Sequence, residues 1–386
     1  MLASKKTLAS LSGMRLGRCL VPSKIDPPIT NRPSFNLLPP SELAQKSNNI
    51  LAGRKYLPGS WSQTFPKFLT NPRIGLPHAL SVANADKASF RELGQLCRKE
   101  LDVSLPRFGV ILFRGMGLSV AKDFSEFTMG LGYEAMRYVG GTGNRHLVDE
   151  EACLFTSTDD PMEFNIELHN EMACSTIHPK KVIFCCIQAP GPGNGGLTPI
   201  ARNSEVFSSL DPKVIHILQE RRIRYLRYLP DEKEKKYTSW QQSFMTQDPQ
   251  AVEKFLRNVN FNFKWDKSDN SLRYWYVLDP LVPHPTTGQP VWFNQANVHH
   301  NTYYKESPMF GGVELSNDMY PTHTTYGDGS EIETEVIRHI RDINWSNAVG
   351  FQWQNGDVIV IDNILAMHAR LSFTGKRNIL SFLTNN

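Results

Sequence analysis

The stretch GDVIVIDNILAMHARLSFTGKRNIL, residues 356–380, decides the fold that we predict for this chain. Its apolar runs are short and rich in β-branched residues, and turn-forming residues separate them, as in a series of strands. With the residues on either side, it gives four strand candidates in a row: Val349–Trp353, Asp357–Asp362, Ala366–Leu371 and Ile379–Leu383. Such closely spaced strands predict a β core in the C-terminal part of the chain.

Helices are predicted mainly before this core. In Asp86–Val103, the apolar residues Phe90, Leu93, Cys97 and Leu101 recur at three- and four-residue spacing, which is typical of one buried helical face. Further helices are predicted at 119–131, 205–210, 248–259 and 331–345 and from 211 onward, and further strands at 107–114, 181–188, 222–229, 261–265, 272–278 and 290–294. We therefore predict an α+β protein with an all-β core, a double-stranded β-helix (jelly roll, cupin-like) dressed with α-helices.

The N-terminal part differs in composition from the rest. Residues 1–25 contain several basic residues and frequent serine and threonine, and the first acidic residue is Asp26. This composition predicts a mitochondrial transit peptide, and the alternative is a basic tail on a cytoplasmic protein. Residues 26–60 are proline-rich and predict an irregular arm, so that the folded domain spans 61–386 and begins near Trp61–Phe68.

Length, charge and cysteine content exclude several classes of protein. The 386 residues are 40% hydrophobic and 21% charged, enough to bury a sizeable core. The net charge is only +4 and the basic residues are scattered, so nucleic acid is not an expected partner. No run of eighteen apolar residues predicts a membrane span. The six cysteines form no Cys-x-x-Cys pair, which argues against structural zinc, and nothing in the sequence indicates an oligomeric state.

One short motif, Leu168-His169-Asn170-Glu171, points to a metal site. On extended backbone, residues i and i+2 face the same way, so His169 and Glu171 can reach one ion. A distant histidine, His368, can complete the set of two histidines and one carboxylate that holds Fe(II) on one face and leaves the other open. Because the chain has eleven histidines, the motif alone is weak, and its weight comes from its surroundings.

Four features occur in a fixed order: His169-x-Glu171, then Gly195-Gly196-Leu197-Thr198 about 25 residues later, then His368, and Arg377 nine residues beyond it. In this order the chain resembles the Fe(II)/2-oxoglutarate oxygenases of the taurine dioxygenase and clavaminate synthase-like group. The resemblance extends from Asp86 to the C-terminus. It is strongest in ELHNEMA (167–173), GNGGLTPIARNSEVFSSLDP (193–212) and GDVIVIDNILAMHARLSFTGKRNIL (356–380).

The resemblance implies a role for each of these residues. His169, Glu171 and His368 would be the iron ligands, and Arg377 would bind the distal carboxylate of 2-oxoglutarate through a planar, charge-assisted contact. Thr198 would donate a hydrogen bond to the other end of this co-substrate. The implied activity is a dioxygenase that couples 2-oxoglutarate decarboxylation, to succinate and CO₂, with O₂-dependent oxidation of an unidentified small metabolite. Family halogenases lack the carboxylate ligand, so Glu171 favours an oxygenase.

The sequence also departs from the family pattern. Taurine dioxygenase has a second arginine, which binds the substrate sulfonate, at the position that is Ser381 here, so a sulfonate substrate is not expected. Arg370 lies two residues beyond His368, on the same strand face, and is a candidate for binding an anionic substrate group; a salt bridge outside the site is the alternative. Asn294 is a candidate pocket residue, with a side-chain bond at a strand end as its alternative.

Neighbouring polar residues and other classes of protein complete the expectations. The adjacent His299-His300 would face opposite ways on a strand, which predicts surface or pocket-rim residues rather than a ligand pair. Asp362 and Asn363 are expected to orient the turn before His368 or to support the ligands. Two alternatives stay open. One is a zinc hydrolase with the same ligands, although that function would give Arg377 and Thr198 no role. The other is a non-catalytic jelly-roll binding protein.

Overall fold

The computed structural model describes residues 32–44, 69–138, 145–162, 165–234, 237–305, 310 and 313–386. Residues 32–386 make up one of two units of the chain, and the other unit, 1–31, lies outside the described residues. The predicted transit segment 1–25 and the proposed domain start at 61–68 therefore both lie outside the described residues.

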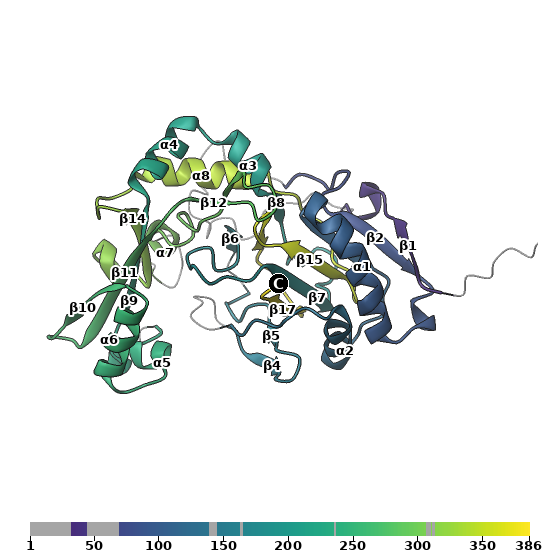
Figure 1. The fold of residues 1–386 in the computed structure, drawn as a ribbon, viewed down its shortest axis with the longest axis horizontal. Helices are drawn as coiled ribbons and strands as arrows, with labels where there is room; N and C mark the ends of the chain where they lie inside the picture. Colours follow the sequence, from purple (N-terminus) through teal and green to yellow (C-terminus); the bar gives the residue numbers. More distant parts are fainter. Residues whose placement is uncertain are drawn as a thin grey trace, which may run out of the picture. The chain divides into compact units, whose positions relative to one another are not determined.

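The largest sheet has eight strands in the order β1-β2-β3-β15-β7-β17-β5-β4 (Figure 1). Its centre is antiparallel, with β15 between β3 and β7, and β2 runs parallel to β3. The central strands are buried almost throughout, which explains their continuous apolar sequences. The bounds are β1 Ser34–Leu37, β2 His78–Ala83, β3 Val110–Arg114, β4 Leu147–Asp149, β5 Leu154–Thr156, β7 Lys181–Gln188, β15 Val358–Asp362 and β17 Asn378–Thr384.

A three-stranded sheet packs against this large sheet. It consists of β6 (Ile166–His169), β16 (Ala366–Arg370) and β8 (Ile200–Arg202), in the order β6-β16-β8, all antiparallel. The two sheets share one buried hydrophobic cluster, to which the large sheet contributes residues such as Phe184 and the small sheet residues such as Ile200. The pairing of β6 with β16 sets segments about 200 residues apart in the sequence side by side.

Two helices cover the other face of the large sheet. They are α1 (Phe90–Phe108) and α2 (Ala121–Leu131), which bury Leu93, Cys97 and Phe124 in a second hydrophobic cluster with strand residues of the sheet. The α1 helix begins with a capping box between Ser89 and Glu92. It ends at Gly109, whose φ of +74° suits glycine.

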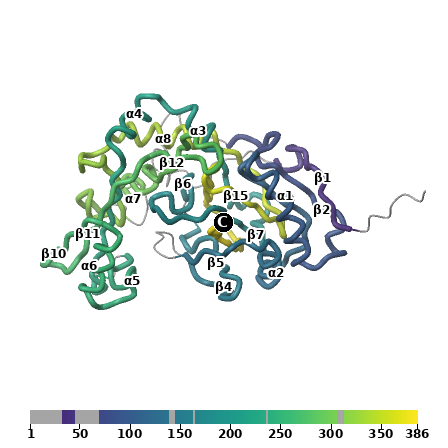
Figure 2. The backbone as a smooth tube through the Cα atoms, in the orientation of Figure 1, coloured from purple at the N-terminus to yellow at the C-terminus, as the bar shows by residue number. Residues whose placement is uncertain are grey.

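A separate antiparallel sheet, in the order β10-β11-β9-β14, lies beside α5 and α6 (Figure 2). Its strands are β9 Ile223–Leu229, β10 Asn262–Asp266, β11 Ser271–Leu278 and β14 Thr322–Tyr326. The short strands β12 (Leu281–Pro283) and β13 (Pro290–Trp292) pair with each other. The remaining helices are α3 Asn203–Ser209, α4 Pro212–Arg221, α5 Trp240–Phe244, α6 Pro249–Asn258, α7 Thr302–Lys305 and α8 Thr334–Ser346. None of the helices in the described residues has the length and apolar character needed to cross a bilayer.

The predicted mixture of a β core and added helices is confirmed in its coarse form, as an α+β protein, and three local predictions were wrong. β1 lies inside the stretch 26–60 that was expected to be irregular, because Ser34–Leu37 pairs with β2. The first long helix continues past Val103, because Leu105 is still buried and its packing outweighs the hydrogen bond lost at Pro106. Val349–Trp353 is buried but makes only isolated bridges, through Val349 to Thr70 and Ile200.

Candidate active site

The three predicted metal ligands converge. Glu171 Oε2 lies 3.5 Å from His368 Nε2 and 3.9 Å from His169 Nε2. One ligand atom from each residue lies within 4.8 Å of the other two, and the imidazole centroids are 4.4 Å apart. The pairing of His368 with His169 across β16 and β6 produces this arrangement, because paired residues of antiparallel strands project their side chains to the same face.

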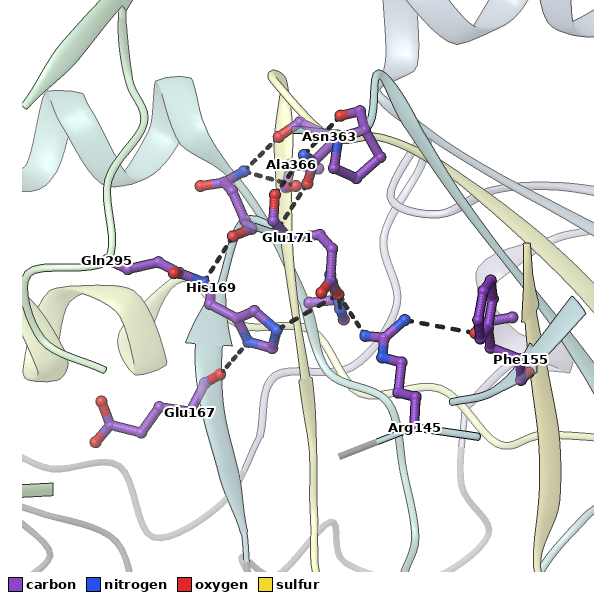
Figure 3. A network of polar contacts seen from close by, with 12 residues as sticks. Arg145, Phe155, Glu167, His169, Glu171, Gln295, Asn363 and Ala366 are labelled. Atoms are coloured by element: carbon purple, nitrogen blue, oxygen red, sulfur yellow. Dashed lines mark hydrogen bonds and ion pairs between the residues drawn. The ribbon is translucent and has the colours of Figure 1, made fainter. Parts of the chain in front are cut away.

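Glu171, the predicted carboxylate ligand, lies in a turn rather than in a strand. β6 ends at His169, so the prediction that the extended strand continues through Glu171 was wrong. Asn363 fixes the turn: its Oδ1 accepts from the Glu171 N–H (2.7 Å) and its Nδ2 donates to the Glu171 carbonyl (2.9 Å), as Figure 3 shows. Asp362 Oδ1 accepts from the N–H groups of Ile364 and Leu365 and orders the turn before β16. Both residues therefore have the supporting role that the sequence predicted.

Hydrogen bonding sets the tautomer of His169. Its Nδ1 lies 2.7 Å from the Glu167 carbonyl oxygen, which can only accept, so Nδ1 carries the proton and Nε2 keeps a lone pair that faces Glu171 (Figure 3). Burial, together with the neighbouring His368, lowers the pKa of His169 to about 4. The ring is therefore neutral near pH 7, as a metal ligand must be.

Arg145 belongs to the site, although the sequence did not predict it. Its Nη2 donates to Glu171 Oε2 at 2.5 Å, and both side chains are buried. Burial alone would raise the pKa of Glu171, but Arg145 and the two histidines outweigh it and hold this pKa well below the usual range. Glu171 is therefore an anion. Arg145 follows the glycine-rich run Tyr138–Gly143 and carries no periodicity or motif that could have identified it.

Arg145 also bears on the expectation about sulfonates. Its Nη1 lies 3.4 Å from Ser381 Oγ, so a guanidinium from another part of the chain reaches the position where taurine dioxygenase has its second arginine. The lack of an arginine at 381 therefore does not leave this region without a positive charge, and the expectation that the substrate is not a sulfonate stays a prediction.

Arg377 and Thr198 form the second part of the site. Arg377 Nε donates to the Gly196 carbonyl (3.0 Å) and its Nη2 to Thr198 Oγ1 (3.3 Å). Thr198 Oγ1 also accepts from Trp353 Nε1 (3.0 Å), which leaves the hydroxyl proton free to be donated to a ligand. Gly196 has a φ of +71°, which favours glycine, and a Cβ there would lie only 3.0 Å from the Arg377 side chain.

One cavity of about 260 Å³ contains six of the seven predicted site residues: His169, Glu171, Thr198, His368, Arg370 and Arg377. Burial and the nearby Arg370 lower the pKa of Arg377 to about 9. Among the described residues, no acidic side chain pairs with Arg377. A cavity with an arginine that lacks a carboxylate partner is suited to an anionic ligand.

The two tentative substrate residues have different positions. Arg370 lines the cavity and donates to the backbone carbonyls of Asp160 (2.9 Å) and Pro161 (2.6 Å), beside the Asp160 carboxyl group. Asn294 does not line it: its Nδ2 donates to the Pro280 carbonyl and its Oδ1 accepts from the Ala296 N–H, which is the structural alternative considered for it. The neighbouring Gln295 lines the cavity instead.

A second cluster contains the same residue types. His300, His323 and Glu331 also place ligand atoms within 4.8 Å of one another. However, His323 Nδ1 accepts from the Asn301 N–H (3.3 Å), so its proton lies on Nε2, which faces Glu331 at 2.9 Å. This arrangement is a hydrogen-bonded pair. The prediction that His299 and His300 are surface or rim residues was wrong in part: both are buried, and only His299 of the two lines the cavity.

Comparison with known proteins gives consistent matches over most of the chain. The model of the family "Taurine catabolism dioxygenase TauD, TfdA family" matches residues 75–383. The dapdiamide synthesis protein DdaC of Enterobacter agglomerans is 33% identical over 308 residues, which cover 79% of this chain and 90% of that protein. A clavaminate synthase-like protein of Arabidopsis thaliana is 26% identical over 329 residues, 83% of this chain and 94% of that protein. The solved structure of PvcB from Pseudomonas aeruginosa is similar with a TM-score of 0.46 and 14% identity, over 82% of this chain and 87% of that one.

Proposed function

The chain belongs to the TauD, TfdA family of dioxygenases, and from this premise we propose how its cavity carries out the family's reaction. The protein is a non-haem Fe(II)- and 2-oxoglutarate-dependent dioxygenase. It couples the conversion of 2-oxoglutarate and O₂ to succinate and CO₂ with oxidation of a small-molecule substrate. The residue assignments that follow, and hydroxylation as the form of the oxidation, are our proposal.

His169, Glu171 and His368 are proposed to hold the iron. The donor set fits Fe(II): two imidazoles and one ionised carboxylate bind on one side of the ion and leave positions for a bidentate co-substrate and O₂. Two observations support the fit. His169 presents a lone pair toward Glu171, and His368 Nε2 faces the same carboxylate at 3.5 Å, while its Nδ1 is buried without a hydrogen-bond partner among the described residues. When bound, the iron supplies the activation of O₂ that the oxidation requires.

Arg377 and Thr198 are proposed to bind 2-oxoglutarate. The observation that carries the proposal is the Arg377 guanidinium, which has no acidic partner among the described residues and lies in the same cavity as the three ligands. A dicarboxylate satisfies it through a charge-assisted pair, while the free Thr198 hydroxyl proton bonds the same ligand. A zinc hydrolase has no 2-oxoglutarate to bind and so would not account for Arg377 or Thr198.

The remaining residues of the cavity position the reactants and exclude water. Arg145 holds Glu171 from one side while Asn363 holds its backbone from the other, so the carboxylate keeps one orientation. Aromatic side chains, among them Tyr303, Tyr304 and Phe184, line the walls and make the cavity less accessible to solvent. The chain thus fixes the geometry in which substrate and co-substrate meet.

We also propose that the eight-stranded and three-stranded sheets are the two halves of a jelly roll. Antiparallel pairing within each sheet supports this. In the large sheet, β7 lies between β15 and β17. In the small sheet, β16 lies between β6 and β8. The shared hydrophobic cluster places their inner faces together. The metal-binding histidines then lie on the smaller sheet, facing the space between the two.

The function is tested with protein loaded with Fe(II) under anaerobic conditions. Binding of 2-oxoglutarate is measured by calorimetry, and succinate is measured after O₂ is admitted in the presence of candidate metabolites. We expect stoichiometric 2-oxoglutarate binding that depends on the metal, and O₂-dependent succinate. A metal-loaded protein that does not bind 2-oxoglutarate and releases no succinate would refute the proposal.

A further inference from the structure

Gln295, in the wall of the cavity, has one polar atom without a partner. Its Nε2 donates to the Asn170 carbonyl at 3.0 Å, and because only the nitrogen can donate to a carbonyl, the orientation of the amide is fixed. Gln295 is 5% exposed, and its Oε1 has no hydrogen-bond partner among the described residues. Gln295 lines the cavity whereas Asn170 does not, so the free acceptor is on the cavity side.

Asn165 shows the opposite polarity. Its Oδ1 accepts from the Ser372 N–H at 2.6 Å, which again fixes the amide, and its Nδ2 is left without a partner among the described residues. The side chain is 2% exposed and lines the cavity, while Ser372 does not. The cavity wall therefore carries a buried acceptor on Gln295 and a buried donor on Asn165, and a buried polar group that stays unsatisfied is destabilising.

The charges of the cavity indicate the charge of the missing ligand. Among the described residues that line it, Arg145, Arg370 and Arg377 bring three positive charges, and Glu171 and Asp160 bring two negative ones. Fe²⁺ and the 2-oxoglutarate dianion, both required by the proposed function, cancel each other. One positive charge is left, so a substrate with one negative charge makes the loaded cavity neutral. Arg145 Nε is buried and has no hydrogen-bond partner in the part of the chain that the structure describes, so it can donate to such an anion.

We propose that the substrate is an amide-bearing monocarboxylate, the class to which N-acyl amino acids belong. Its amide N–H donates to Gln295 Oε1, its amide carbonyl accepts from Asn165 Nδ2, and its carboxylate pairs with the guanidinium groups of Arg145 and Arg370. The inference rests on the proposed function, because the count of charges includes the iron and 2-oxoglutarate.

The test uses the protein loaded with Fe(II) and 2-oxoglutarate under anaerobic conditions, with binding measured by calorimetry. The probes are the N-acetyl derivatives of alanine, leucine, glutamine and phenylalanine. Each is compared with its O-acetyl 2-hydroxy acid, in which oxygen replaces the amide N–H, and with its primary amide, which lacks the carboxylate. We expect at least one N-acetyl amino acid to bind about tenfold or more tightly than both of its analogues.

A variant of Gln295 tests whether this residue distinguishes the N-acetyl amino acid from its ester analogue. Gln295→Met removes the acceptor and should bring the affinities for the N-acetyl amino acid and its ester within about threefold of each other, with 2-oxoglutarate binding retained as evidence of folding. Gln289→Met, the same change at an exposed position, should keep the wild-type preference. If none of the N-acetyl amino acids binds better than its analogues while 2-oxoglutarate still binds, the substrate inference is wrong and the dioxygenase proposal stands. Failure of 2-oxoglutarate itself to bind would overturn both.

Discussion

Two clusters in this molecule have the same composition, two histidines and one glutamate, with ligand atoms within 4.8 Å of one another. In the first, Glu171 and His368 are buried and His169 is nearly so, and all three line a cavity with an arginine that lacks an acidic partner among the described residues. In the second, the two histidines are buried, but the carboxylate side chain of Glu331 is 56% exposed. Proximity alone does not distinguish them.

The hydrogen bond at the far ring nitrogen distinguishes them. In the first cluster, the Glu167 carbonyl accepts a hydrogen bond from His169 Nδ1–H, so that Nε2 carries a lone pair that can bind a metal. In the second, a backbone N–H of Asn301 occupies His323 Nδ1, so that the proton lies on Nε2 and is donated to Glu331. The same three residue types are therefore suited to binding a metal in one cluster and form a hydrogen-bonded pair in the other, according to one backbone contact.

Removal of one histidine from each cluster gives the largest expected difference. His368→Ala should reduce Fe(II) or Co(II) affinity by more than about a hundredfold, since loss of an outer-shell partner alone costs 10–100-fold. His323→Ala should leave metal stoichiometry unchanged. Metal analysis after gel filtration and a cobalt titration measure both, with circular dichroism to confirm folding. If His323→Ala lost the metal and His368→Ala kept it, the assignment of the two clusters would be reversed.

The first cluster was predictable from the sequence because its signals are local and ordered. The motif containing His169 and Glu171, and the spacing of His368 and Arg377, predicted that these residues share one site, and the structure brings them to one cavity. The long strands followed from their apolar runs. Arg145 and Asp160 were not predictable, because their roles come only from tertiary contacts. β14, with the sequence THTTY, was missed because it is buried on both faces without the apolar residues by which strands are recognised.

The next effect concerns the co-substrate rather than the metal. Arg377→Ala should raise the 2-oxoglutarate concentration needed for half-saturation by about tenfold to a hundredfold, because a charge-assisted contact in a buried site is lost. Metal affinity should stay within about threefold of the wild type. Calorimetric titration of the Co(II)-loaded variant measures 2-oxoglutarate binding without turnover. If the variant needed the same 2-oxoglutarate concentration for half-saturation as the wild type, the proposal that Arg377 binds 2-oxoglutarate would be wrong.

His300, in the second cluster, should make stability depend on pH. Burial, with the nearby charges of His323, Arg341 and Lys305, lowers the pKa of His300 to about 2. Below about pH 6.5 the unfolded chain binds a proton there that the folded chain does not, so stability falls as pH falls. The loss at pH 5 is about 2 kcal/mol, from 1.4 kcal/mol per pH unit. His300→Gln should remove this part of the difference in urea-unfolding free energy between pH 7 and pH 5, with metal binding retained.

The smallest effect is expected at the carboxylate of the second cluster. Glu331→Gln keeps the size of the side chain and an acceptor for His323 Nε2, and the exposed pair with His323 is worth under about 1 kcal/mol. The unfolding free energy of the Glu331→Gln variant at pH 7 should therefore change by less than that amount, and its metal content should not change.

Glu171→Gln makes the matched change in the first cluster, where the charge is buried and held by Arg145. There the loss of the anion should abolish stoichiometric Co(II) binding. If Glu331→Gln and Glu171→Gln lost equal amounts of metal, both clusters would hold metal. The tautomer of His323 would then not determine whether a cluster binds metal.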